Sequence, residues 1–121
     1  MQSDQRALLC SEYASDRKAL DIKVLHISKL SSLADYLVLA TGTSDRQVQA
    51  IAESVRLGLK QNYNLQPLAV EGMNEGRWVL LDYGDVMVHV FQQEVRSFYD
   101  LDGLWSEADE LELLQENAAN R

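Results

Sequence analysis

The sequence predicts an α/β (α+β) fold in which a mixed five-stranded sheet carries packed helices. Three observations predict it. The run Tyr36-Leu37-Val38-Leu39-Ala40 is apolar throughout, as in a strand that is covered on both faces. Residues 44–62 repeat apolar side chains at helical spacing, and residues 78–91 alternate around a glycine-containing turn as an antiparallel hairpin does. A chain of 121 residues suits one such domain with a single modest core.

The predicted helix over residues 44–62 has the clearest beginning. It follows the turn Thr41-Gly42-Thr43-Ser44, and Ser44 with Gln47 fits a capping box, in which the hydroxyl and the amide each satisfy a free backbone N–H. Residues 7–20 and 93–101 are predicted as two further helices, the first with looser apolar spacing. One face of the helix over 44–62 is apolar and is predicted to be buried: Val48, Ile51, Ala52, Val55 and Leu59.

The hairpin turn Tyr83-Gly84-Asp85 joins the last two predicted strands, and Gly84 gives it the backbone freedom that a tight turn needs. The resulting order is α-β-β-α-β-β-β-α, after which Leu104 and Trp105 are expected to fold back onto the core. Residues 1–105 are therefore predicted as one domain, and the acidic residues 106–121 as a frayed, solvated tail. The five strands are predicted at residues 21–28, 36–40, 68–71, 78–82 and 86–91.

Composition and charge limit the function. The chain carries 19 Asp and Glu against 11 Lys and Arg, a net charge of −8. Because contacts to phosphates supply most of the non-specific affinity for nucleic acids, this charge argues against direct sequence-specific nucleic-acid binding and favours a basic protein partner. No apolar run approaches membrane-spanning length and no signal-peptide core is visible, so we expect a cytoplasmic protein without a membrane partner. The lone Cys10 excludes an internal disulfide.

Three groups of residues could carry catalysis, and each has a simpler structural explanation. The turn at 41–44 could hold an anion at a helix N-terminus, but it lacks the lysine of a phosphate loop, and a turn with a helix cap explains it. Asp82 and Asp85 flank the hairpin turn, where aspartate is favoured for local hydrogen bonds. His26 and His89 lack the spacing of a metal site. The sequence therefore predicts no catalytic residue, no metal and no cofactor.

Trp78 begins an alternating strand, and Leu80 follows two residues later on the same face. If these side chains face solvent, they form an apolar patch of the kind that marks protein interfaces. The alternative is that Trp78 caps the core, and the pattern alone favours neither.

Four segments match one known pattern in their order and spacing: Ala34–Val48, Val70–Gly72, Trp78–Phe91 and Arg96–Trp105. Together they resemble the ribosomal silencing factor family, RsfS, also called Iojap-like. The combined order and spacing of these segments is highly specific and covers most of residues 7–105. The departures are Ala34, where serine is frequent in the family, and a longer acidic tail.

The resemblance implies a fold related to nucleotidyltransferases but without their catalytic carboxylates. It implies that the protein binds the large ribosomal subunit through the ribosomal protein numbered fourteen on the intersubunit face. Binding there would sterically block joining of the small subunit and repress translation under starvation or in stationary phase. Trp78 and Leu80 would be apolar anchors, and Asp85 would pair with a basic side chain of the partner. The implied partner-binding surface comprises Trp78, Leu80, Tyr83, Asp85 and Met87, with weaker support for Glu71 and Arg96.

Other functions are compatible with the same residues. A large-subunit assembly factor, the role linked to organellar relatives, would use the same docking surface. A nucleotide-binding enzyme or nucleotidyltransferase would use the turn at 41–44 with Asp82 or Asp85. A homodimer that buries Trp78 is a further hypothesis, and it would compete with docking.

Overall fold

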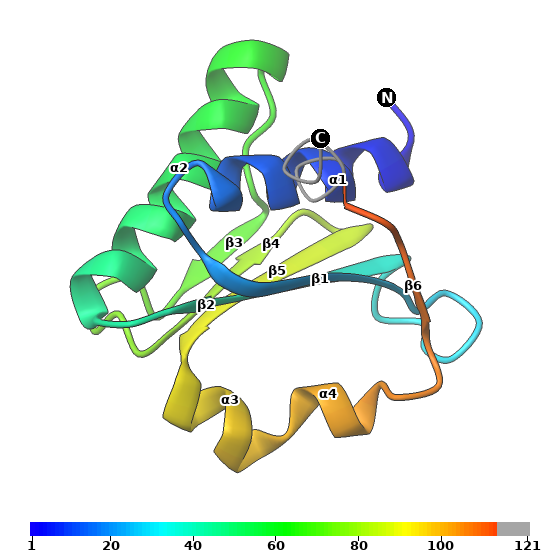
Figure 1. Cartoon of the computed structure of the whole chain (residues 1–121). Coiled ribbons are helices and arrows are strands. Elements are labelled where there is room, and N and C mark those ends of the chain that lie inside the picture. The colour runs from blue at the N-terminus through cyan, green and yellow to red at the C-terminus, as the bar shows by residue number, and fades with distance from the viewer. Residues whose placement is uncertain (114–121) are drawn as a thin grey trace, which may run out of the picture.

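The computed structural model describes residues 1–113, which form a six-stranded mixed sheet with helices on both faces (Figure 1). The strand order is β3-β4-β5-β2-β1-β6. β2 and β5 pair in parallel, and the other neighbours are antiparallel. The predicted mixed fold is confirmed, but the sheet has six strands, not five. The strands are β1 (Leu20–His26), β2 (Tyr36–Gly42), β3 (Ala69–Glu71), β4 (Trp78–Asp82), β5 (Val86–Gln92) and β6 (Asp109–Glu110).

Two pairs of helices cover the two faces of the sheet (Figure 1). α1 (Ser3–Ser15) and α2 (Asp45–Tyr63) enclose the larger core against one face. α3 (Gln93–Tyr99) and α4 (Leu101–Leu104) lie on the other face, above a smaller core that includes Leu39, Phe91 and Val95. Within residues 1–113, no helix combines the length and the apolar character needed to cross a bilayer.

The sixth strand comes from the segment that was predicted as a frayed tail, and that prediction is wrong for residues 106–113. Asp109–Glu110 pair with β1, and the N–H of Leu111 donates to the Val24 carbonyl at 2.8 Å. Leu113 is only 9% exposed and belongs to the larger core. Leucine at 111 and 113 has the two-residue period of a strand, which the surrounding carboxylates conceal. Residues 114–121 lie outside the described residues, and a domain boundary at 105 stays a prediction.

The predicted cap of α2 is confirmed with one changed partner. Ser44 Oγ accepts from the Gln47 N–H at 3.1 Å. The Gln47 side chain reaches one residue further back than a capping box requires, because its Oε1 accepts from the Thr43 N–H at 2.6 Å. Its Nε2 donates to the carbonyls of Arg17 and Lys18, which follow α1. The predicted buried face is also confirmed: Val48, Ile51, Ala52, Val55 and Leu59 are the buried residues of α2.

Residues with left-handed backbone follow two helices and explain their shifted boundaries. α1 ends at Ser15, and Lys18, at φ 61°, turns the chain toward β1, so the helix predicted over 7–20 is placed too late. Asp100, at φ 48°, divides the helix predicted over 93–101 into α3 and α4. Trp105 then packs against the smaller core as predicted, whereas Leu104 is exposed.

Gly72 is the glycine with the tightest surroundings. Its φ is +79°, and a Cβ there would lie 2.0 Å from the Trp78 carbonyl oxygen. We expect Gly72→Ala to lower the free energy of unfolding by about 3 kcal/mol, through positive-φ strain together with this overlap. Gly84→Ala is the matched control, because its φ is +86° but its Cβ would lie 3.4 Å from Leu68 Cδ1. Its expected loss is about 1 kcal/mol. Denaturant unfolding measures both, and equal losses would contradict the prediction.

Candidate interaction surface

The half of the sheet formed by β3, β4 and β5 is closed on the α2 side and partly open on the other. Val79 and Leu81 of β4 are fully buried, while Trp78, Leu80 and Asp82, which alternate with them, are partly exposed. The register carries this pattern across strands, because Trp78 lies opposite Phe91 and Leu80 lies opposite His89. Side chains at these alternate positions therefore form a face that α3 covers only at one end.

Trp78 stands at the border between the smaller core and solvent. Its ring centroid lies 5.8 Å from that of Phe91 and 4.9 Å from that of Tyr99. Its Nε1 donates to His89 Nδ1 at 2.9 Å, which fixes the indole. Tyr99 is 55% exposed, and the adjacent Phe98 is 80% exposed. The two interpretations of Trp78 therefore both hold in part, since one side of the ring packs on the core and the other belongs to a solvent-facing cluster. We call Trp78, Leu80, Phe98 and Tyr99 the aromatic surface.

A pocket of about 240 Å³ lies beside Trp78, lined by Glu71, Trp78, Leu80 and His89. Glu71 of β3 lies opposite Leu80 of β4, which in turn lies opposite His89 of β5, so the three form one row across the strands. Burial lowers the pKa of His89 to about 4. The imidazole is therefore neutral at physiological pH, and with Nδ1 accepting from the indole it carries its proton on Nε2.

Tyr83 and Asp85 do not join Trp78, although the sequence grouped them with it. Tyr83 packs against the larger core on the α1–α2 side, where burial raises its pKa. Asp85 forms an ion pair with Arg6 of α1. The carboxylate predicted to meet a basic partner already has a cation within the chain. Met87, by contrast, packs against the smaller core and alternates with His89, so it does share the face of Trp78.

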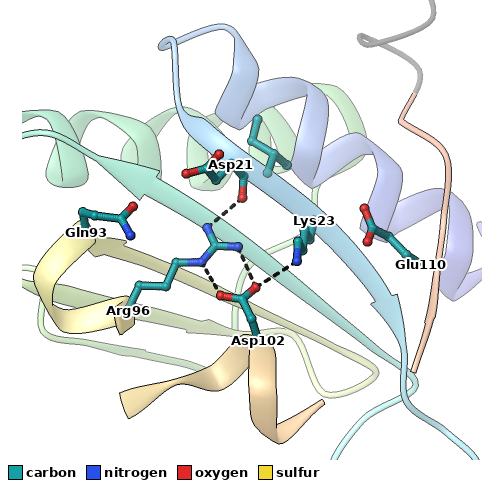
Figure 2. A pocket seen from close by; sticks show the side chains of 7 residues that line it. Asp21, Lys23, Gln93, Arg96, Asp102 and Glu110 are labelled. Atoms are coloured by element: carbon teal, nitrogen blue, oxygen red, sulfur yellow. Dashed lines mark hydrogen bonds and ion pairs between the residues drawn. The ribbon is translucent and has the colours of Figure 1, made fainter. Parts of the chain in front are cut away.

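Arg96 of α3 is buried between that helix and the strands β1 and β2 (Figure 2). It is 4% exposed, and its Nη1 donates to the Asp21 carbonyl at 2.7 Å and to Thr41 Oγ1 at 2.8 Å. Its Nε and Nη2 each donate to the Asp102 carboxylate at 2.9 Å. Lys23 Nζ lies 3.3 Å from the same carboxylate. These contacts hold α3 and α4 against β1 and β2. Arg96 therefore stabilises the helix that carries Phe98 and Tyr99 but is itself buried and not part of the aromatic surface.

This anchor predicts a pH dependence of stability. Hydrogen bonds from Arg96 lower the pKa of Asp102 to about 2, below the value of about 3.9 for an unfolded aspartate. The stabilisation is therefore complete above about pH 4 and is lost as the pH falls toward 2. We expect Asp102→Asn to lower the melting temperature at pH 7 and to flatten its decline between about pH 4 and pH 2. Thermal unfolding against pH tests this, with Glu107→Gln, an exposed carboxylate, as control. A decline as steep as that of the wild type would contradict it.

The residues weighed as catalytic candidates take part in local structure. Asp82 Oδ1 accepts from the Gly84 N–H at 2.8 Å, which confirms its role in the turn. The Thr43 N–H and hydroxyl both donate to Gln47, so the turn before α2 is closed by its own helix. His26 bonds Ser28 Oγ at 2.8 Å. Residues 1–113 bring together no group of three or more His, Cys, Asp or Glu that could hold a metal ion.

His89 lines the pocket, and Phe98 and Tyr99 belong to the aromatic surface; none of the three was predicted as a docking residue from the sequence. The hairpin register, which the sequence did predict, places His89 opposite Leu80 and so could have identified it. Phe98 and Tyr99 are adjacent in a helix of seven residues, about 100° apart around its axis, so a narrow buried stripe does not cover both rings fully. That pattern could have indicated exposure of at least one ring.

Comparisons with known proteins agree on one family. A family model described as "Ribosomal silencing factor during starvation" matches residues 1–121. Ribosomal silencing factor RsfS of Bacillus subtilis is 45% identical over 93 residues, covering 77% of this chain and 78% of that protein. RsfS of Chromobacterium violaceum is 43% identical over 105 residues, covering 87% and 85%. The chloroplastic protein Iojap of Zea mays is 34% identical over 108 residues, covering 88% of this chain and 46% of that protein.

Solved structures give the same result for the fold. A crystal structure of a protein from Chromobacterium violaceum superimposes with a TM-score of 0.84 at 39% identity, covering 94% of this chain and 93% of that chain. One from Bacillus halodurans gives a TM-score of 0.78 at 33% identity, covering 92% and 100%.

Proposed function

The chain belongs to the ribosomal silencing factor family, and we propose that it binds the large ribosomal subunit and keeps the small subunit from joining. On this proposal the protein represses translation in the cytoplasm by occupying space, without catalysis. The proposed process, ribosome silencing, rests on the names of the relatives, and the proposed mode of binding rests on the aromatic surface.

The single observation that carries the attachment is the exposure of the aromatic surface. Phe98 and Tyr99 are mostly in water, and Trp78 continues their cluster onto the sheet. Exposed aromatic side chains in contact with one another are unfavourable in a monomer and typical of the centre of a protein interface. Trp78 is held in one orientation by His89, so little conformational entropy is lost when a partner covers it.

The charge of the chain supports a basic protein as the partner. A net charge of −8 steers the chain toward positively charged proteins and away from bare RNA. The resemblance of the sequence to the family indicates the ribosomal protein numbered fourteen, on the intersubunit face of the large subunit. A protein attached there occupies the space that the small subunit needs, and steric exclusion requires no further chemistry.

Sucrose-gradient sedimentation of purified subunits at near-physiological magnesium tests the proposal. We expect the protein to travel with the large subunit and to reduce the fraction of joined ribosomes as its concentration rises. Failure to bind either subunit would overturn the proposal. Binding without any change in joining, together with immature large subunits in a deletion strain, would replace silencing by an assembly role.

A further inference from the structure

We propose that the pocket lined by Glu71, Trp78, Leu80 and His89 receives a basic side chain, lysine or arginine, of the protein partner, with Glu71 as the anion that holds it. This inference rests on the proposed function, and it adds the chemistry by which the partner is recognised at the aromatic surface. Pairing with a basic side chain of the partner, the role expected of Asp85, is here assigned to Glu71.

The first step is the shape and lining of the pocket. Trp78 and Leu80 supply apolar walls, and the volume of about 240 Å³ accommodates one extended side chain. A lysine or arginine has a methylene stem that buries well against such walls and a charged head that must be satisfied. The indole face adds an attraction for the cation, which is largest for tryptophan among the aromatic side chains.

The second step is the charge that remains available. Asp85 is paired with Arg6, Asp102 with Arg96 and Lys23, and Asp82 accepts from a backbone N–H in its own turn. Glu71 is an exposed carboxylate on β3 at the pocket. Because Glu71 is the acidic residue in the lining of the pocket, it carries the charge that meets a cation entering there.

The third step is the state of His89. A protonated imidazole in the pocket would repel a basic side chain, but burial lowers the pKa of His89 to about 4 and keeps the ring neutral. Its Nε2 proton is a donor suited to a backbone carbonyl of the partner. The pocket thus offers a negative charge at Glu71, apolar walls and one donor, which matches a basic residue together with a neighbouring peptide carbonyl.

Binding of the full chain to purified large ribosomal subunits tests this, measured as a dissociation constant at about 50 mM and about 200 mM monovalent salt. Loss of a charge-assisted contact should weaken binding of Glu71→Gln about tenfold at the lower salt. Its salt dependence should also be shallower than that of the wild type. Glu71→Lys should weaken binding about 100-fold, because it places like charges together. Glu75→Gln removes an exposed carboxylate from the loop between β3 and β4 and should bind like the wild type.

The outcomes separate this inference from the proposed function. If the wild type binds, Trp78→Ala does not, and Glu71→Gln equals Glu75→Gln at both salt concentrations, the pocket takes no cation and docking through the aromatic surface stands. Undiminished binding of Glu71→Lys would overturn the inference in the same way. If the wild type itself does not bind large subunits, the proposed function fails and this inference fails with it.

Discussion

Trp78→Ala is expected to bind the large ribosomal subunit at least about 30-fold more weakly than the wild type, which corresponds to about 2 kcal/mol or more. Trp78 lies between the sheet and α3, where its ring contacts Tyr99 and its indole N–H is fixed by His89. It also forms a wall of the pocket that holds Glu71 and Leu80. Its removal takes away the centre of the aromatic surface and leaves the flanking rings without support.

The control for this prediction is Tyr63→Ala. Tyr63 is an exposed aromatic residue at the end of α2, away from the aromatic surface, and its truncation should leave subunit binding within about twofold of the wild type. Because Trp78 also packs on Phe91, circular dichroism must first show that the variant is folded at the temperature of the assay. Co-sedimentation of folded Trp78→Ala at the level of the wild type would contradict the prediction.

The same pair of variants tests the homodimer hypothesis. If two copies associate by burying Trp78, light scattering should show self-association of the wild type and of Tyr63→Ala but not of Trp78→Ala. Addition of large subunits should then dissociate the dimer, since dimerisation and subunit binding would use the same face. Self-association of Trp78→Ala would place any dimer interface elsewhere.

The elements that the sequence predicted best are those whose burial follows a short period. The five buried positions of α2 lie within one short segment of the chain, and so does the hairpin of β4 and β5. The spacing of apolar residues within each segment is therefore enough to predict it. β6 was missed because two paired residues are too few to show alternation, and because Glu110 and Glu112 flank Leu111. β6 forms only because it pairs with β1, and this pairing cannot be predicted from the residues near 109–110.

In the candidate site, too, local patterns were predictable and contacts between distant residues were not. Trp78 and Leu80 could be grouped from the alternation along one strand, and the structure places them side by side at one pocket. The contacts that Asp85 and Arg96 make within the chain were not predicted, because these partners are distant in sequence. Arg6 precedes Asp85 by 79 residues, and Asp21 precedes Arg96 by 75. The Arg6–Asp85 ion pair and the hydrogen bond from Arg96 to the Asp21 carbonyl depend on the packing of α1 and α3 on the sheet, so the sequence alone does not show them.

Arg96→Met is expected to lower the free energy of unfolding by about 3 kcal/mol, because it removes four hydrogen bonds made by a guanidinium that is only 4% exposed, two of them to a carboxylate. The four hydrogen bonds go to Asp21, Thr41 and Asp102, and of these three acceptors Asp102 keeps a second cation, Lys23. The guanidinium also lies 5.5 Å from the centroid of the Phe91 ring. Arg96→Lys keeps the charge but not the two parallel bonds to Asp102, so its expected loss is smaller, about 1 to 2 kcal/mol. Denaturant unfolding at pH 7 measures both.

The double variant Arg96→Met/Asp102→Asn separates the ion pair from the rest of the anchor. If the stranded charge of Asp102 accounts for much of the cost, the double variant should lose less stability than the sum of the two single variants, by about 1 kcal/mol or more. Because α3 carries Phe98 and Tyr99, Arg96→Met should also bind large subunits more weakly than Gly84→Ala, even at a temperature where both are folded. Strict additivity of the stability losses, with equal subunit binding, would show that Arg96 neither pairs with Asp102 in solution nor positions the aromatic surface.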